Sequence, residues 1–371
     1  MSRIEELINE LCPDGVEYKT LDEICNITRG RVMSKDYLRD NAGDYPVYSS
    51  QTLNNGIFGY IDNYDYDYES ITWTTDGANA GSVFYHINEK FSITNVCGLL
   101  RVLNAQEVNT RFLYYCLQVR TKEYVNSGMG NPKLMSNVMA RVIVPLPPLP
   151  VQQEIVRILD NFTELTAELT AELTARKKQY EYYRNLLLNF SGDRDVEVKW
   201  MTLGDACENI ASGNNKVRNE SGEFPVYGST GIIAYSDNYK YNEDLLLVAR
   251  VGANAGFVHR ATGQYEVSDN TLIVKPKASY NITFAYYQLL NMKLNDLAVG
   301  GGQPLITAGK LKQIMIPVPS LKEQARIVSI LKRFDMLTND LKSGLPAEIE
   351  ARRKQYEYYR DKLLTFKEAS A

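Results

Sequence analysis

Histidine is scarce in this chain, with only His86 and His259 among 371 residues. Neither has a cysteine, histidine or carboxylate neighbour at the spacing that a zinc site requires. The chain also lacks a glycine-rich phosphate loop ending in Gly-Lys-Ser/Thr and the Gly-x-Ser-x-Gly turn of serine hydrolases. These absences argue against a self-sufficient enzyme with its own metal or nucleotide.

Two short motifs approach catalytic ones without completing them. Asn131-Pro-Lys133 lacks the Pro-aromatic pair that an amino-methyltransferase motif needs. Gly300-Gly-Gly-Gln-Pro304 has the glycines of a phosphate loop, but no helix follows it at once. A tight turn ahead of the last strand is the better interpretation of this segment.

Long apolar runs are missing as well, since none approaches the roughly 18 residues that a membrane span needs. The first ten residues have the pattern of an acidic amphipathic helix rather than of a signal peptide. The cysteines are odd in number and widely spaced, which is typical of reduced thiols in a cytoplasmic protein. We expect Cys25 and Cys207 to be buried structural residues at matching places. The five are Cys12, Cys25, Cys97, Cys116 and Cys207.

Positive charge is not in excess, because the formal net charge is -4. A generic nucleic-acid coat is therefore disfavoured. Residues 1–150 carry 18 acidic and 13 basic side chains, whereas 319–371 carry 8 and 11. Binding to DNA would need local basic patches, or partner subunits that neutralise phosphates.

What the chain does contain is a repeat of itself. Gly-Ala-Asn-Ala-Gly begins at Gly77 and again at Gly252, and Gln-Tyr-Glu-Tyr-Tyr-Arg begins at Gln179 and Gln355. The period is too long for a solenoid unit and has the size of a domain plus a long helix. Two similar bodies in one chain predict internal pseudo-two-fold symmetry and a target that is read in two halves.

Each half begins with a mixed region rich in Tyr, Val, Ile and Gly, residues 18–145 and 198–317. Short alternating runs predict strands, for example at 45–49 and 245–249. Residues 112–117 and 284–289 predict matching helices. A proline-rich hinge closes each region, at 145–150 and 317–319.

A long helix follows each hinge, the first at about 151–190. Apolar residues three and four apart form a stripe in both helices and predict a helix–helix seam. The second helix has four extra residues, which include Gly344 and Pro346 and should kink or briefly break it. The first contains a Thr-Ala-Glu-Leu repeat within 163–174. The seam residues are Ile155, Ile158, Phe162, Leu165 and Leu169, matched by Ile327, Ile330, Phe334, Leu337 and Leu341.

The order of these elements resembles the specificity subunit of a type I restriction–modification enzyme over essentially the whole chain. The motifs that carry the resemblance are two hinge-and-helix segments, Leu146-Pro-Pro-Leu-Pro-Val-Gln-Gln-Glu-Ile155 and Val318-Pro-Ser-Leu-Lys-Glu-Gln-Ala-Arg-Ile327, together with the Thr-Ala-Glu-Leu tract. The resemblance implies an α+β fold: two mixed α/β target recognition domains separated by two long helices packed as an antiparallel coiled coil. This chain departs from the family pattern in its second helix, which is longer and kinked, so the two spacer helices should differ in length.

The resemblance also implies a division of labour. Target recognition domains are expected at 1–149 and 193–319, and spacer helices at 150–192 and 320–371. The chain itself would be a non-catalytic subunit of a DNA adenine methyltransferase and type I endonuclease complex, without a cofactor of its own. Its partners would be double-stranded DNA, two modification (methyltransferase) subunits and restriction/translocase subunits, and no membrane. S-adenosylmethionine, ATP and Mg would belong to those partners.

Reading bases needs Arg, Lys, Asn, Gln or Ser on exposed loops, and several matched loops offer them. Divergent loops are the better base readers, whereas a loop shared by both halves suits phosphate or scaffold. The candidates in the first half are Arg29, Arg31, Lys35, Ser50, Gln51, Asn79 and Lys133. Those in the second half are Asn214, Asn215, Lys216, Arg218, Ser229, Arg250, Asn254 and Gln303.

Alternatives remain open at this point. The Gly-Ala-Asn-Ala-Gly loops fit a turn held by the Asn side chain as well as they fit a DNA contact. The basic stretches 176–178 and 352–354 fit a solvated helix face, or a contact to DNA or a partner. A structural coiled-coil adaptor whose two bodies bind protein or carbohydrate is the alternative function. Sequence-specific DNA binding together with a modification subunit would separate the two functions.

Overall fold

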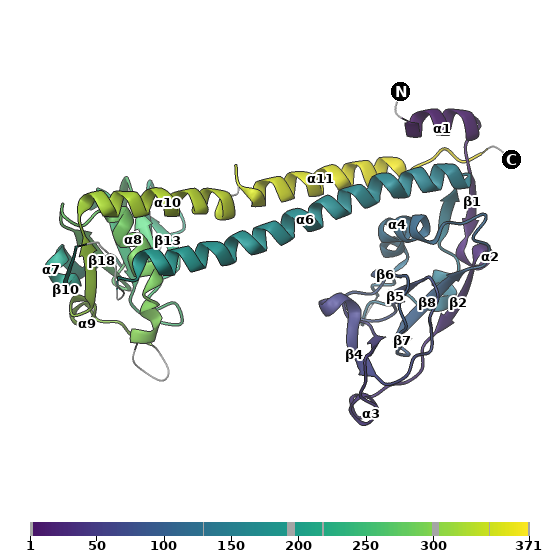
Figure 1. Cartoon of the computed structure of the whole chain (residues 1–371), viewed down its shortest axis with the longest axis horizontal. Helices are drawn as coiled ribbons and strands as arrows, with labels where there is room; N and C mark the ends of the chain where they lie inside the picture. Colours follow the sequence, from purple (N-terminus) through teal and green to yellow (C-terminus); the bar gives the residue numbers. More distant parts are fainter. Residues whose placement is uncertain are drawn as a thin grey trace. The chain divides into compact units, whose positions relative to one another are not determined.

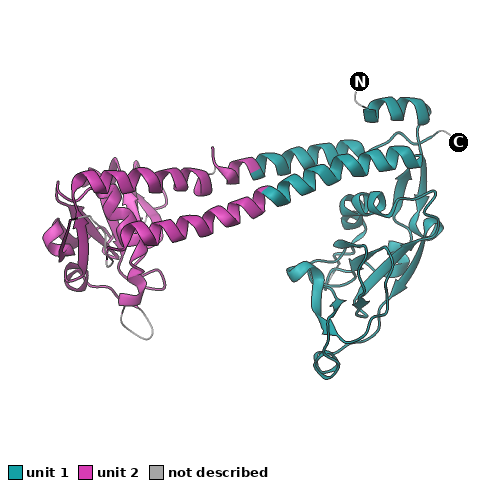
Figure 2. Ribbon diagram, viewed as in Figure 1, with its two compact units in different colours: residues 1–168, 349–371 teal, residues 169–348 magenta. Residues whose placement is uncertain are grey.

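The computed structural model describes residues 3–128, 130–190, 197–216, 219–298, 304–340 and 342–369. The chain forms two compact units, one of residues 1–168 with 349–371 and the other of residues 169–348 (Figure 2). Three predicted site residues, Arg218, Gln303 and Leu341, lie outside the described residues, as does most of the proposed turn at 300–304.

Among the described residues of unit 1, the strands form three small sheets, and Figure 1 shows how they are arranged within the unit. β1 pairs with β9, a four-stranded sheet has the order β2-β8-β5-β6, and a three-stranded sheet has the order β4-β3-β7. The elements are α1 (Arg3–Leu11), β1 (Glu17–Thr20), α2 (Leu21–Ile24), β2 (Cys25–Arg29), α3 (Lys35–Asp40), β3 (Tyr45–Tyr48), η1 (Leu53–Gly56), β4 (Ile57–Ile61), β5 (Ser70–Thr74), β6 (Val83–His86), β7 (Ser92–Ile93), β8 (Cys97–Val102), α4 (Thr110–Arg120), η2 (Thr121–Tyr124), α5 (Ser136–Met139) and β9 (Ile143–Leu146).

Unit 2 repeats this topology, except that β14 extends the sheet that corresponds to β4-β3-β7. β10 pairs with β19, and two four-stranded sheets have the orders β11-β18-β15-β16 and β13-β12-β17-β14. The elements are β10 (Val198–Thr202), α7 (Leu203–Ala206), β11 (Cys207–Ser212), β12 (Phe224–Gly228), β13 (Gly231–Ser236), β14 (Tyr241–Asn242), β15 (Leu245–Ala249), β16 (Val258–Ala261), β17 (Gln264–Val267), β18 (Thr271–Pro276), α8 (Ile282–Asn291), η3 (Leu294–Leu297), α9 (Ala308–Lys312) and β19 (Met315–Pro319).

The predicted strands and helices within the two bodies are confirmed. Every residue of β5 and of β15 is buried, which is why these runs are apolar or β-branched at nearly every position. α4 and α8 each begin at an asparagine, Asn109 and Asn281, whose side chain accepts backbone N–H groups of the first turn. A side chain at Gly98 would meet the ring of Trp73, so the closely packed core of unit 1 requires glycine there.

The long helices pack against each other in opposite chain directions. α6 (Leu149–Leu188) belongs to unit 1 in its first half and to unit 2 in its second half. In unit 1, α11 (Leu345–Leu363) lies along it, with the rings of Phe162 and Tyr359 5.6 Å apart. In unit 2, α10 (Leu321–Asn339) lies along it, with the ring of Phe334 5.9 Å from that of Tyr180. The antiparallel helix pair is therefore confirmed.

The second helix is broken where the four extra residues occur, as Gly344 and Pro346 predicted. A side chain at Gly344 would lie 2.4 Å from the carbonyl oxygen of Met336 and 2.9 Å from that of Asp340, so the chain folds back tightly on the end of α10. After Leu363 the helix ends, and the N–H of Val16 donates to the carbonyl of Lys367 at 2.9 Å.

The residues of α6 and α10 that are most buried are only partly those of the predicted apolar stripe. Ile155 and Ile327 are fully buried, but Leu159 and Leu331, which the stripe omitted, are fully buried too, because they face the core of their own unit. Ile158, Phe162, Leu165, Leu169, Ile330 and Phe334 are partly buried. Leu337 is 37% exposed, in the last turn of α10 beside the break, and its place in the seam stays a prediction.

Candidate nucleic-acid interface

The predicted loops of unit 1 meet at the segment 94–96, between β7 and β8. The backbone N–H of Thr75 donates to the carbonyl of Val96 at 3.1 Å, and the hydroxyl of Ser50 donates to the same oxygen. A guanidinium nitrogen of Arg29 donates to the carbonyl of Asn95 at 2.5 Å and to the Thr75 hydroxyl at 3.2 Å. Three separate candidate loops are thus joined by one short connection.

Unit 2 has the same junction at the segment 268–270. The backbone N–H of Arg250 donates to the carbonyl of Asn270 at 2.9 Å, and the hydroxyl of Ser229 donates to it at 3.0 Å. The Arg250 guanidinium donates to the carbonyl of Asp269 at 3.3 Å. Arg29 and Arg250 start from different strands, yet each binds the corresponding carbonyl of its junction.

The Gly-Ala-Asn-Ala-Gly loops are shaped by their glycines. Gly77 and Gly81, like Gly252 and Gly256, have φ between 82° and 92°, a left-handed region that favours glycine. Asn79 is exposed, and so is its counterpart Asn254, and no described hydrogen bond holds either side chain. The interpretation in which the Asn side chain holds the turn is therefore wrong, because backbone hydrogen bonds and glycine conformations suffice.

A fourth loop packs on each of these turns. The N–H of Gly77 donates to the carbonyl of Pro132 at 3.0 Å, and that of Gly252 donates to Pro304 at 3.0 Å. In unit 1 this contact brings Lys133 to the turn, with its ammonium 3.8 Å from Asp76 and its side chain 56% exposed. The candidates Arg29, Ser50, Asn79 and Lys133 therefore belong to one connected surface.

Arg31 and Lys35 form a neighbouring group around α3. The Arg31 guanidinium donates to Asp65 at 3.1 Å and to the Tyr37 hydroxyl at 2.9 Å. The hydrogen bond with Tyr37 raises the pKa of Arg31, and the carboxylate of Asp65 partly offsets the positive charge of the Arg31 guanidinium. Lys35 is exposed. An Arg31 contact to DNA would require it to leave or share Asp65.

The remaining candidates divide into engaged and exposed side chains. The Gln51 amide donates to the carbonyl of Ile57, which fixes the loop before η1. The Asn214 carbonyl accepts from the ammonium of Lys240 at 3.2 Å, and the N–H of Asn215 donates to Val267 at 3.0 Å. Lys216 is exposed.

The junction segments themselves were missed. Asn95, Asp269 and Asn270 were not predicted, although they hold the loops together through their carbonyl oxygens. A weak repeat, Ile93-Thr-Asn95 against Val267-Ser-Asp269, marks them in the sequence. Backbone acceptors have no side-chain signature, so their role required the structure.

The two histidine side chains are held within the folded units. His86 is 4% exposed and bonded to the Thr72 hydroxyl at 2.8 Å and to Glu89 at 3.0 Å, inside the core of unit 1. Burial lowers the pKa of His259. Among the described residues, no cluster of three or more His, Cys, Asp or Glu side chains could hold a metal ion. Within that same part of the chain, no helix combines the length and apolarity required to span a membrane.

Each body is fastened to its long helix by a buried glutamine. The carbonyl of Gln152 accepts the N–H of Asn109 at 2.8 Å, and its amide donates to the carbonyls of Glu107 at 2.8 Å and Pro147 at 2.7 Å. Gln324 makes the same three contacts, to Asn281 at 2.7 Å, Ser279 at 3.0 Å and Pro319 at 2.8 Å. These glutamines of the hinge motif join hinge, helix and body in both halves.

Comparison with known proteins agrees with this duplicated architecture. The family model "Type I restriction modification DNA specificity domain" matches residues 13–176 and 195–351. A Mycoplasma pneumoniae protein assigned as a type I specificity subunit is 35% identical over 356 residues, 93% of this chain and 96% of that protein. A Haemophilus influenzae protein assigned as a type I restriction enzyme specificity subunit is 33% identical over 384 residues, 95% and 96% of the two chains.

Solved structures share the fold. The S subunit of a type I system from M. genitalium aligns with a TM-score of 0.57 at 18% identity, covering 94% of this chain and 95% of that one. A chain from a study of complex assembly in the type I R-M system aligns with a TM-score of 0.60 at 17% identity, covering 95% and 98%. None of these comparisons favours the adaptor alternative. The chain belongs to the family of type I restriction–modification specificity subunits, and it is the DNA-recognition subunit of such a complex.

Proposed function

We propose that this chain reads a bipartite, asymmetric DNA target, one half-site with each body, and holds the enzymatic subunits of the complex in place. The target recognition domains would be residues 1–149 and 193–319, joined by spacer helices at 150–192 and 320–371. The supporting observation is a loop junction that is built alike in both units but carries different polar side chains. Two loop junctions with the same backbone geometry but different polar side chains would let the two units recognise different base sequences.

The loops divide by the contact that each would make. The turns at Asn79 and Asn254, with the adjoining Lys133, have the same backbone in both units and would contact phosphates. The divergent loops that carry Arg29, Arg31 and Lys35 in unit 1 and Asn214, Asn215 and Lys216 in unit 2 would contact bases. The same surfaces are bordered by Ser50, Gln51, Ser229 and Arg250. Two other residues, Arg218 and Gln303, remain candidates by sequence alone.

The catalytic work would belong to partners. Two modification subunits would bind S-adenosylmethionine and methylate adenine, and restriction/translocase subunits would use ATP and Mg in the cytoplasm. The unit-by-unit repetition of the exposed Tyr182 and Tyr358, 63% and 62% exposed, supports two equivalent docking positions on the helices. The acidic net charge of this chain fits a complex in which partners neutralise many phosphates.

The first experiment is to map methylated adenines after co-expressing this chain with its modification subunit. The proposal requires one two-part target whose halves differ. A continuous target, or binding without sequence preference, would contradict it.

The division into phosphate and base contacts is tested by Lys133→Ala, with Lys19→Ala in the β1–β9 sheet as the control for lost charge. Lys133→Ala should weaken binding to all sequences and reduce the salt slope of log K by about 0.9. A change of the methylated sequence instead would assign Lys133 to base reading. The control should leave both the target and the slope as they are.

A further inference from the structure

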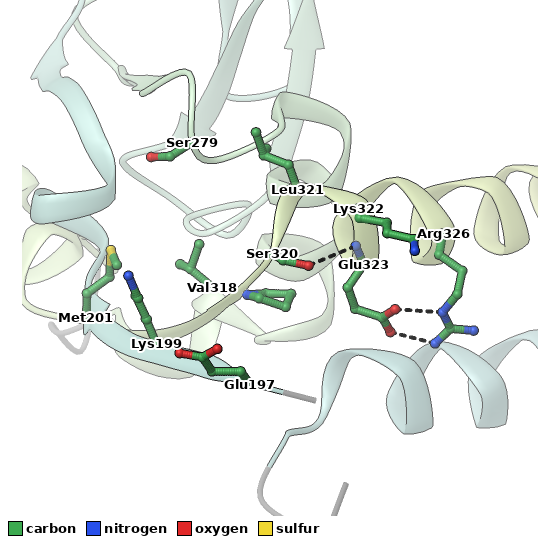
Figure 3. Close-up of a pocket in the computed structure, with 11 residues that line it drawn as sticks. Glu197, Lys199, Met201, Ser279, Val318, Ser320, Leu321, Lys322, Glu323 and Arg326 are labelled. Atoms are coloured by element: carbon green, nitrogen blue, oxygen red, sulfur yellow. Dashed lines mark hydrogen bonds and ion pairs between the residues drawn. The ribbon is translucent and has the colours of Figure 1, made fainter. Parts of the chain in front are cut away.

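Unit 2 has a surface groove of about 820 Å³ where β10 and β19 meet the start of α10 (Figure 3). Met201, Val318 and Leu321 form its apolar part, and the Leu321 side chain is 53% exposed. Charged side chains line the rest. They are Glu197, Lys199, Lys322, Glu323 and Arg326, of which Glu323 and Arg326 form a bidentate pair at 2.6 and 2.7 Å.

The same position in unit 1 is contacted by α1 and by residues 367–369. Strand pairing sets the correspondence, because Glu17 is opposite Leu146 as Lys199 is opposite Val318. Counting from the equivalent glutamines, Glu154 of α6 corresponds to Arg326 of α10. Arg3 of α1 lies 3.7 Å from Glu154.

The apolar face of α1 completes that contact. Ile4 is 7% exposed and belongs to the buried cluster that contains Val16 and Val151. Val151 is fully buried, whereas its counterpart Glu323 lines the groove. In the described part of unit 2 no helix occupies the position that α1 has in unit 1. The groove thus corresponds to a surface that contacts a helix in unit 1.

Two charges at this surface are reversed between the units, and each of the two helix residues also forms an ion pair within its own helix, Glu154 with Arg157 and Arg326 with Glu323. Glu17 and Glu154 of unit 1 are replaced by Lys199 and Arg326 in unit 2. A copy of α1 placed in the groove would bring Arg3 to a rim with three cationic and two acidic side chains, which is less favourable than the carboxylates Glu17 and Glu154 of unit 1. A helix with the same apolar spacing and a carboxylate in place of Arg3 would be complementary.

We propose that the groove binds an amphipathic α-helix of a partner polypeptide, with an α1-like apolar face and a carboxylate facing Arg326. Helix-in-groove docking needs apolar anchors three and four residues apart, as Ile4, Leu7 and Ile8 are in α1. The proposal concerns a protein partner, so it stands or falls separately from DNA reading.

The test uses the full-length chain and two fluorescent, helix-stabilised peptides with the sequence of residues 3–12, one native and one carrying Arg3→Glu. Fluorescence anisotropy at low salt should show the Arg3→Glu peptide binding about fivefold tighter, the size expected when a like-charge contact at an exposed rim becomes an opposite-charge one. The double variant Lys199→Glu/Arg326→Glu places carboxylates where unit 1 has Glu17 and Glu154, and it should invert the preference. Failure to invert it would overturn the proposal.

Two further variants locate the binding. Leu321→Glu should abolish binding of both peptides while adding a favourable charge to the first turn of α10. Met336→Glu, at a 61% exposed position on the same helix outside the groove, should leave binding unchanged. Circular dichroism verifies that all variants are folded. Absent binding, binding that survives Leu321→Glu, or tighter binding of the native peptide would each refute the proposal, the last in favour of a second copy of this chain.

Discussion

Gln152→Leu should destabilise unit 1 far more than Gln153→Leu, the same change at the next residue of α6. The substitution keeps most of the side-chain volume but leaves the N–H of Asn109 and the carbonyls of Glu107 and Pro147 without their partner. An unsatisfied buried group costs about 1–3 kcal/mol, and only the contact to Pro147 is fully buried. We therefore expect a loss of about 3 kcal/mol in the free energy of unfolding of unit 1.

The two tryptophans allow each unit to be followed separately. Trp73 is fully buried in unit 1, and Trp200 in unit 2 is 52% exposed. In a Trp200→Phe background, urea unfolding monitored by Trp73 fluorescence reports unit 1. Gln153→Leu is the matched control, because Gln153 is an exposed neighbour on the same helix and its replacement should change the free energy by under about 0.5 kcal/mol.

Hydrogen exchange gives a second, local readout. The Asn109 amide loses its acceptor in Gln152→Leu and should exchange faster, whereas amides in β15 of unit 2 should not change. If Gln152→Leu is no more destabilising than Gln153→Leu, the glutamine does not fasten the helix to the body. The hinge motif would then need another explanation.

Three further results are expected. Burial raises the pKa of Cys25, Cys97, Cys116 and Cys207 to about 12, so at pH 8 the thiolate is rarer than in the unfolded chain and alkylation of the native protein should be slow; rapid labelling without denaturant would contradict their burial. Leu331→Asp should cost roughly 4 kcal/mol in the free energy of unfolding by burying an unpaired charge, and more than Ile330→Asp, with Met336→Asp as the exposed control; equal costs in urea unfolding would contradict the deeper burial of Leu331 in the core of unit 2. Deleting Ala167–Thr170 shortens α6 by about 6 Å and should shorten the target spacer by one or two base pairs with unchanged half-sites, whereas an unchanged spacer at full methylation would show that α6 does not set the spacing.

The repeated elements were predictable because their signals are local. Apolar alternation marked β3 and β15, the three-and-four spacing marked α6, and Gly344 with Pro346 marked the break between α10 and α11. The duplicated order of these signals was enough to indicate the family. Local sequence patterns predicted individual helices and strands, and the duplication of these patterns predicted two similar bodies.

The site was less predictable because it depends on contacts distant in sequence. Arg29 and Arg250 were chosen as basic loop residues, but only the structure shows that their guanidinium groups bind carbonyls of the junctions near Asn95 and Asp269. Gln152 looked like part of a motif, and nothing in its spacing indicated three backbone partners. Leu159 and Leu331 were not singled out, because helices that face both a partner helix and a domain core carry two overlapping apolar stripes.

The central claim is that each body reads its own half-site. The most direct measurement replaces residues 18–145 with a second copy of 198–317 and maps the methylated adenines produced with the modification subunit. Two copies of the second body related by the pseudo-two-fold axis should methylate a palindromic target built from the second half-site. An asymmetric target identical to that of the unaltered chain would contradict the account.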